Sequence, residues 1–130
     1  MWVAGRITLA TCLLVVTPVK RNKNVHYIFE VTAKPGYDIE HYAAAWVRAS
    51  ELIQQSPGAA GTRLHRKIGD PNTALAIATW DSKAARDASS ASLPERVREI
   101  IAQQAPFVDI QFIGEYESPE WVVLPDGRAD

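Results

Sequence analysis

The sequence is poor in cysteine, since Cys12 is the only one in 130 residues. An intramolecular disulfide is therefore impossible, and neither a C-x-x-C pair nor a group of Cys and His at metal-ligand spacing occurs. These absences give no reason to expect a metal site, and they make the cytoplasm the expected compartment.

An excess of charge of one sign is missing as well. Fourteen Lys and Arg stand against fifteen Asp and Glu, and no basic block is longer than the KRNK of residues 20–23. Such a chain has no basic cluster that would bind nucleic acid or an anionic membrane, so the expected partner is a small neutral or weakly acidic molecule. A length of 130 residues is enough for one domain with a sizeable core.

A hydrophobic run long enough to cross a bilayer is also absent. The run from Ile7 to Val19 has thirteen apolar or Thr residues, and it ends in TPVKRNK rather than in the small residues of a signal-peptide cleavage site. Its Thr, Val, Leu and Ile content predicts a buried strand, with a membrane anchor as the less favoured alternative. Residues 1–24 are thus expected to be a retained N-terminal extension that adds an extra strand.

Hydrophobic periodicity predicts four strands and two helical regions after this extension. The turn residues Gly69 to Asn72 are expected to join the second and third strands as a hairpin. The second helical region is expected to break before a capping-box pair formed by Ser92 and Glu95. In chain order the prediction is strand 25–33, helix 38–55, strand 62–68, strand 73–80, a short helix ending near 88, a longer helix carrying 93–101, and strand 107–117.

Two strands have faces of different chemistry. In the second strand Thr62 and Leu64 alternate with the basic or polar Arg63, His65 and Lys67. In the last strand the apolar residues Val108, Ile110 and Phe112 alternate with a polar set that is expected to share the other face: Asp109, Gln111 and Glu115.

The order strand, helix, strand, strand, helix, strand predicts an α+β fold, the ferredoxin-like split-βαβ arrangement with an antiparallel sheet. Because both helices would cover the same sheet face, the apolar row containing Leu75 and Ile77 would remain in water unless a second copy covered it. A homodimer is therefore expected. Residues 25–117 are expected to form the domain, and residues 118–130, with the apolar patch Trp121 to Leu124, a C-terminal tail.

The stretch LAIATWDSKAARDA, residues 75–88, changes from strand alternation to helix-forming residues at Trp80. On the strand face that ends in Trp80, every preceding side chain is small, and we call these residues the small row: Ala74, Ala76 and Ala78. Two interpretations follow. Either the alanines leave room for a pocket that Trp80 enters, or they let a helix pack closely and Trp80 is a core residue.

Four stretches resemble the antibiotic biosynthesis monooxygenase family of the dimeric α+β barrel superfamily. They are FEVTAKPG at 29–36, the helical AAW that ends at Trp46, SPGAAGTRLHR at 56–66, and LAIATWDSKAARDA. The resemblance covers residues 25 to 117. It implies a dimeric α+β barrel with a substrate cavity between the sheet and its helices.

The resemblance also implies a chemistry. Members of this family act without metal or flavin on phenolic or quinol-like aromatic molecules, whose own anion passes an electron to dioxygen. No cofactor is therefore expected. Such an enzyme needs an apolar chamber, a base for the phenolic proton, and a cation or donor for the developing negative charge.

Three residues are the catalytic candidates under this resemblance. His65 matches a family His in position and is the expected base. Arg98 matches a family Arg on the second helix and is expected to hold an oxyanion. Trp80, which closes the third strand as in the family, completes the set.

Five residues are the candidates for binding the substrate, and two of them depart from the family pattern. Ala76 stands where one family enzyme has Asn, and Arg86 stands where it has Tyr. Arg86 can donate hydrogen bonds but cannot exchange protons as a phenol does. The expected set is Tyr27, Phe29, Trp46, Ala76 and Arg86.

A haem-degrading branch of the superfamily has an Asn on the first strand and a Trp and a His along the second helix. It is excluded, because those positions fall here at about Phe29, Ser89 and Glu99, none of which binds iron as His does. The remaining alternative is a non-catalytic dimer that binds a small apolar ligand. An enzyme should aim His65 and Arg98 into the pocket alongside Trp80, whereas a binding protein could leave the pocket wholly apolar.

Overall fold

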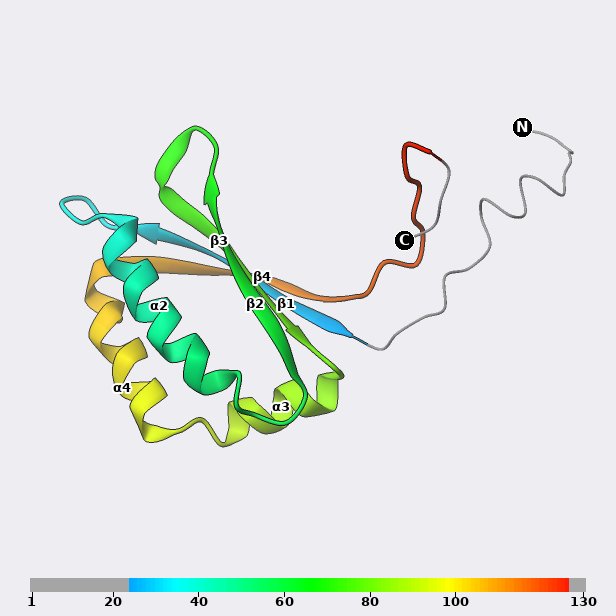
Figure 1. The fold of residues 1–130 in the computed structure, drawn as a ribbon. Coiled ribbons are helices and arrows are strands. Elements are labelled where there is room, and N and C mark those ends of the chain that lie inside the picture. The colour runs from blue at the N-terminus through cyan, green and yellow to red at the C-terminus, as the bar shows by residue number, and fades with distance from the viewer. Residues whose placement is uncertain (1–23, 127–130) are drawn as a thin grey trace, which may run out of the picture. The chain divides into compact units, whose positions relative to one another are not determined.

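The computed structural model describes residues 24–126, and its helices and strands belong to one compact unit, Lys23–Glu117 (Figure 1). The predicted extra strand at residues 7–16 lies outside the described residues. The elements are β1 (Val25–Ala33), α2 (Ile39–Ile53), β2 (Ala59–Lys67), β3 (Asp70–Trp80), α3 (Lys83–Ala91), α4 (Glu95–Gln104), the 3₁₀ turn η1 (Ala105–Phe107) and β4 (Val108–Glu117).

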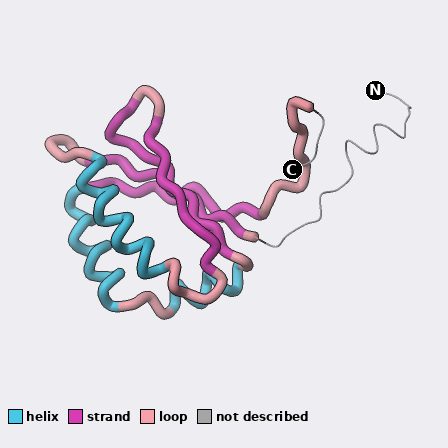
Figure 2. The backbone as a smooth tube through the Cα atoms, in the orientation of Figure 1, coloured by secondary structure: helices cyan, strands magenta, loops and turns pink. Residues whose placement is uncertain are grey.

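The four strands form one antiparallel sheet in the order β2-β3-β1-β4. Figure 2 shows the helices on one side of this sheet. This arrangement confirms the α+β, ferredoxin-like fold predicted from the element order.

Local signals explain where the helices begin. The Asp38 side chain accepts a hydrogen bond of 3.0 Å from the backbone N–H of His41 and so caps α2. Ser82 caps α3 in the same way, through the N–H of Ala85 at 3.1 Å. The capping box predicted for α4 does not form, because the Ser92 hydroxyl instead donates to the carbonyl of Ala88 at 2.9 Å.

The hairpin turn between β2 and β3 is tighter than predicted. Lys67 pairs with Asp70, so the loop consists of Ile68 and Gly69, and β3 already begins at Asp70. Gly69 has a φ of 90°, a left-handed conformation that only glycine adopts without strain. The predicted turn at residues 69–72 is therefore wrong in its position by a few residues.

Two buried clusters fill the space between the sheet and the helices. One joins β1, β3, β4 and the start of α2 around Val31, Ile39 and Tyr42. The other joins α2 to α4 through Ala45 and Val97. Between them these clusters leave the cavity that is described below.

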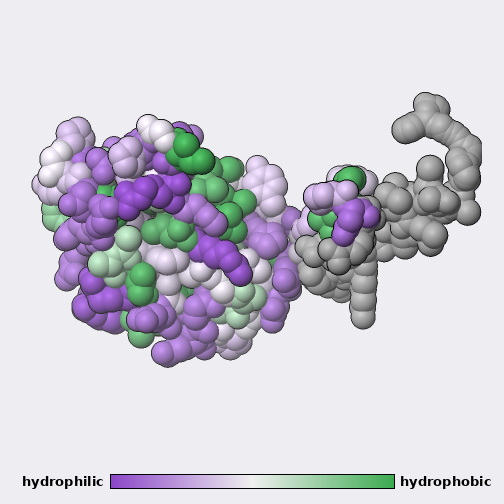
Figure 3. Space-filling view, turned by 45° about the horizontal axis from the view of Figure 1, so that its top comes forward, coloured by the Kyte–Doolittle hydropathy of each residue, from purple (hydrophilic) through white to green (hydrophobic). Residues whose placement is uncertain are grey.

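The opposite sheet face is covered by no helix of residues 24–126. On it the side chains of Leu75 and Ile77 are half-buried, whereas Tyr116 is 54% exposed. In the view of Figure 3, apolar surface interrupts the hydrophilic surface of this unit. The uncovered face thus carries apolar side chains that the described residues, 24–126, do not bury.

The described residues after β4, 118–126, contain no helix or strand. Two of their apolar side chains are largely exposed, Trp121 at 85% and Val123 at 83%. Across residues 24–126, no helix has the length and apolar character needed to span a membrane.

Candidate functional site

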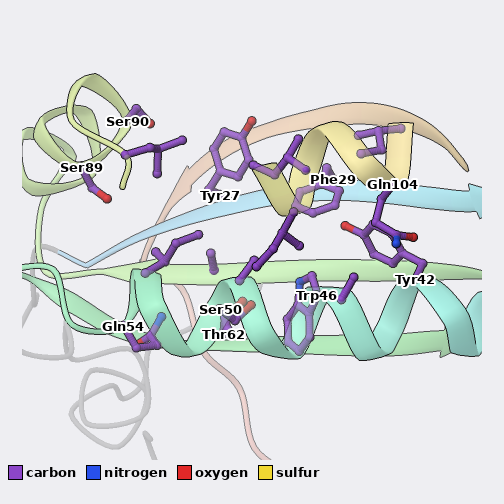
Figure 4. A pocket seen from close by; sticks show the side chains of 18 of the residues that line it. Tyr27, Phe29, Tyr42, Trp46, Ser50, Gln54, Thr62, Ser89, Ser90 and Gln104 are labelled. Atoms are coloured by element: carbon purple, nitrogen blue, oxygen red, sulfur yellow. The ribbon is translucent and has the colours of Figure 1, made fainter. Parts of the chain in front are cut away.

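A cavity of about 490 Å³ lies between the sheet and the helices. This volume falls within the range of sites that hold small organic ligands. Figure 4 shows side chains that reach it from both layers. Its aromatic and polar lining consists of Tyr27, Phe29, Tyr42, Trp46, Trp80, Ser50, Gln54, Thr62, Arg86, Ser89, Ser90 and Gln104, and alanines and aliphatic residues complete it.

The strand register creates this space. On β1 and β3, Tyr27 pairs with Ala78 and Phe29 pairs with Ala76, so on the β3 side each aromatic ring has a methyl group as its neighbour rather than a large side chain. Residues that pair across strands share a sheet face, and here that face is the one toward the helices. Ala78, the member of the small row that lines the cavity, therefore adds to the width of the cavity, and Trp80, only 5% exposed, closes the row.

Helix α2 supplies the opposite wall. Tyr42, Ala45, Trp46 and Ala49 recur at spacings of three and four, which puts them on one helix face. Ala45 and Ala49 pack against α4, and this close approach fixes the wall. Trp46 is only partly buried and borders the cavity along its side.

One end of the cavity carries a cation, the guanidinium of Arg86 on α3. Its central carbon lies 4.1 Å from the centroid of the Tyr27 ring, in a cation–π arrangement. Its Nε lies 3.5 Å from Glu115 Oε2, and its Nη1 lies 3.6 Å from Asp87 Oδ1. The Arg86 side chain is 22% exposed, so this charge is largely shielded from water.

Glu115 reaches this cation because β4 contains a bulge. The register shifts between Ile28 and Phe29 of β1, so that Glu115 pairs with Tyr27 and lies on the helix-facing side of the sheet. The prediction that Glu115 shares a face with Asp109 and Gln111 is therefore wrong. The buried oxygen Oε2 accepts no hydrogen bond within residues 24–126, so charge alone holds it near Arg86.

A second cation lies outside this pair. Lys83 Nζ is 3.5 Å from Glu115 Oε1 and 3.1 Å from Asp87 Oδ2, and its side chain is 62% exposed. The hydrogen bond to Asp87 raises the pKa of Lys83, and the charges of Asp87 and Glu115 add to this. Lys83 does not line the cavity.

The other end of the cavity is lined by Tyr42 and Gln104, which Figure 4 draws beyond Phe29. Both side chains are buried, at 8% exposure each. Burial raises the pKa of the Tyr42 hydroxyl to about 12, so this group remains a protonated donor at neutral pH. The oxygen Oε1 of Gln104 has no hydrogen-bond partner within the described chain.

The cavity brings together five of the eight residues predicted from the sequence, namely Tyr27, Phe29, Trp46, Trp80 and Arg86. Ala76 is buried between Phe29 and Leu64, its register partners, and does not line the cavity.

The other two predicted residues, His65 and Arg98, do not reach the cavity. His65 is exposed on β2 and pairs with Leu75 on the uncovered sheet face, and Arg98 is exposed on α4. Their catalytic roles stay predictions that the cavity of this chain does not support.

The polar residues of this region that were not among the candidates include Tyr42, Gln104 and Glu115. Gln104 continues the buried row Val97 and Ile100 at helical spacing, which is a signal that the sequence carries. Glu115 depends on the bulge, for which the sequence gives only Gly114 as a hint. Within residues 24–126, no group of three or more His, Cys, Asp or Glu side chains is placed to hold a metal ion.

Comparison with known proteins identifies the family. The family model of antibiotic biosynthesis monooxygenase matches residues 24–105. The chain belongs to this family. The match confirms the resemblance predicted from the sequence, and it ends before β4 begins at Val108. No curated protein matches the chain.

Solved structures share the family fold at low sequence identity. SnoaB from Streptomyces nogalater, described as a cofactor-independent oxygenase, is 14% identical with a TM-score of 0.66 over 79% of this chain and 98% of its own. A Nitrosomonas europaea protein, provisionally described as an antibiotic biosynthesis monooxygenase, is 12% identical with a TM-score of 0.64 over 77% and 93%. A Pseudomonas aeruginosa protein is 16% identical with a TM-score of 0.59 over 78% and 99%. These likenesses establish the fold of this family member.

Proposed function

We propose that the protein is a cofactor-independent monooxygenase that acts on a phenolic or quinol-type aromatic molecule. The observation that carries the proposal is a cavity walled by aromatic rings and alanines with one shielded guanidinium, Arg86, at its end. A flat apolar ring system fits between such walls, and the cation matches a phenolate oxygen. Membership of the family and the description of SnoaB support the same class of reaction.

The reaction balances without any added reductant. In an anthrone, the ring methylene loses two hydrogens and becomes a carbonyl. One atom of dioxygen becomes the oxygen of that carbonyl, and the other atom leaves as water with the two hydrogens. The substrate provides all the electrons, and its anion is the form that reduces dioxygen. The protein must therefore favour the anion and exclude bulk water from it.

Arg86 favours the anion by its charge. A cation at contact distance lowers the pKa of a phenol, because it stabilises only the ionised form. The titratable groups that line the cavity are Tyr27, Tyr42 and Arg86, and Tyr42 stays protonated at neutral pH. In this proposal the phenolic proton leaves to water, driven by the lowered pKa, rather than to a histidine of the cavity.

Oxygen consumption tests the proposal. Anthrone and a substituted hydroquinone, incubated with the protein in an oxygen-electrode cell, should cause uptake above the protein-free rate. Under the proposed chemistry, the rate should rise with pH through the pKa of the bound substrate. An uptake rate equal to that of the protein-free control with every such compound would contradict the monooxygenase.

A second candidate, the non-catalytic binding protein, is favoured by one observation. No histidine among the described residues lines the cavity, and most of its wall is apolar. Such a site can hold an aromatic molecule without turning it over. Binding of these compounds without any oxygen uptake would select this alternative.

We also propose that the protein is a homodimer whose interface includes the uncovered sheet face. Leu75, Ile77 and Tyr116 lie on that face, and a second copy would remove them from water. A stable interface of this kind buries about 800 Å² on each partner. Light scattering should give twice the 14.3 kDa of one chain, and a mass near 14.3 kDa would contradict the dimer.

A further inference from the structure

The cavity opens to solvent where α4 leads into β4. Three of its lining residues in this region are exposed, and all three are apolar: Ile101 at 50%, Ile110 at 55%, and Ala105. We call these three residues the apolar mouth. Only the turn η1 separates the end of α4, which carries Ile101, from the start of β4, which carries Ile110, so the three residues border one side of the cavity.

The strand register places the apolar mouth away from the charged end of the cavity. Ile110 pairs with Val31 of β1, whereas Arg86 stacks on Tyr27, four residues earlier on the same strand. Four residues of a strand span roughly 13 Å. The fourth exposed residue of the lining is polar and lies one helical turn after Arg86 on α3: Ser90. The cavity thus has a charged end and, remote from it, an apolar opening.

Helix packing does not require an apolar side chain at Ile101. Helix α4 is held to α2 by Val97 and Ile100, and Ile101 does not belong to that cluster. Its exposed neighbours on the helix include the polar residues Arg98 and Gln103. A single exposed isoleucine is common on protein surfaces, but exposed apolar side chains that border the opening of a cavity indicate a surface that a ligand covers.

Charge decides how an aromatic ligand lies in the cavity. Arg86 is the only charged side chain among the described residues that line it, so an ionised hydroxyl group binds beside Arg86. The opposite side of the ring then points along β1, over Phe29 and toward Ile110. A single phenol ring covers less than half of the roughly 13 Å between the two ends. A substituent of several carbon atoms would therefore reach the apolar mouth.

We propose that the ligand is a phenol or quinol with an aliphatic substituent opposite its ionised oxygen, and that this substituent leaves the cavity through the apolar mouth. The ring lies over Tyr27 and Phe29, and the chain contacts Ile101 and Ile110 before it reaches solvent. This inference rests on the proposed aromatic ligand but not on its oxidation. It makes Ile101 and Ile110 residues that determine specificity for the chain.

Calorimetric titration with 4-ethylphenol, 4-butylphenol and 4-hexylphenol tests the inference, because the chain lengthens on the side opposite the hydroxyl group. Each added methylene should raise the affinity of the wild type about two- to fourfold, as expected for partial to full burial. In the double variant Ile101→Gln/Ile110→Thr, the gain from butyl to hexyl should fall below about twofold, because polar groups replace the apolar contacts. The affinity for 4-ethylphenol should stay that of the wild type, which shows that the cavity is intact.

A hydroxyl group at the end of the hexyl chain shows whether the chain reaches water, and this measurement needs no variant. If the chain leaves through the apolar mouth, the terminal hydroxyl group stays hydrated and should lower the affinity by less than about threefold. A loss of about tenfold or more would mean that the chain ends inside the protein, where the hydroxyl group loses its water, and it would overturn the inference.

Val47→Gln is the matched control, because Val47 is 46% exposed on α2 and does not line the cavity, so the full gain should remain. In light scattering, the double variant should keep the mass of the wild type. A lower mass would show that the apolar mouth is an interface between copies, and it would overturn the inference. Equal affinities of the wild type for the butyl and hexyl compounds, an undiminished gain in the double variant, or no binding of any alkylphenol would overturn it too.

The outcome separates this inference from the proposed function. A gain with chain length that depends on Ile101 and Ile110, without oxygen uptake from anthrone or hydroquinone, would contradict the monooxygenase and keep the role of the apolar mouth. Oxygen uptake without any gain from longer chains would keep the monooxygenase and remove that role.

Discussion

Replacing Arg86 by methionine removes the only cation of residues 24–126 that lines the cavity, while keeping an unbranched side chain of similar length. Two charges about 4 Å apart attract by about 4 kcal/mol at the effective dielectric of a partly shielded site. Glu115 and Asp87 lie within 3.6 Å of Arg86 and offset part of its charge, so about half of that energy should remain for a bound phenolate. The bound phenol should then have a pKa about one to two units lower in the wild type than in Arg86→Met.

The absorbance of bound 2-naphthol distinguishes phenol from phenolate, so a pH titration at saturating protein measures this difference directly. Lys83→Met is the matched control, because Lys83 is a cation on the same helix and also contacts Glu115, but it is exposed and does not line the cavity. Its substitution should move the bound pKa much less. If Arg86→Met and the wild type gave the same bound pKa, Arg86 would not be the group that stabilises the anion.

Four other substitutions follow from the same geometry. Glu115→Gln should free the charge of Arg86 and strengthen phenolate binding by about three- to tenfold in a calorimetric titration; weaker binding would mean that Glu115 is needed to position Arg86. Trp80→Phe should lower the free energy of unfolding by about 1 kcal/mol in urea titrations, since the indole already borders a cavity, whereas a loss above about 3 kcal/mol would identify a tightly packed core residue. His65→Ala and Arg98→Ala should leave oxygen uptake within about twofold, and a loss of a hundredfold or more, typical of a general base, would restore His65 to the mechanism.

The helix and strands that wall the cavity were predictable because their signals are local and long. Nine residues of β1 alternate without interruption, and α2 combines an Asp38 cap with apolar residues at helical spacing. The alternation also predicted which row of β3 faces the helices, and hence that Trp80 and the alanines share one face. Which of the two interpretations of Trp80 applies could not be predicted, because the width of a cavity depends on how closely α2 and α4 pack.

The position of His65 shows a conflict between two kinds of inference. Similarity to the family placed it in the site, whereas alternation placed it with Arg63 on the basic side of β2, opposite Leu64. The structure follows the alternation, and His65 is exposed on the uncovered face. Successive side chains of a strand point to opposite faces of the sheet. A histidine at a position that alternates with the helix-facing residues therefore points away from the cavity, whatever its chemistry.

The bulge in β4 has the opposite consequence, since it moves a residue into the site. Without the extra residue before Gly114, Glu115 would share the face of Asp109 and Gln111, and Arg86 would have only Asp87 nearby. The family match ends at residue 105, so this carboxylate comes from a strand outside the matched region. The cation that we propose for the substrate anion is thus adjusted by a charge from outside the matched region. A member of the family with the same fold but no acid at this position would present a freer cation and should bind the ionised substrate more tightly.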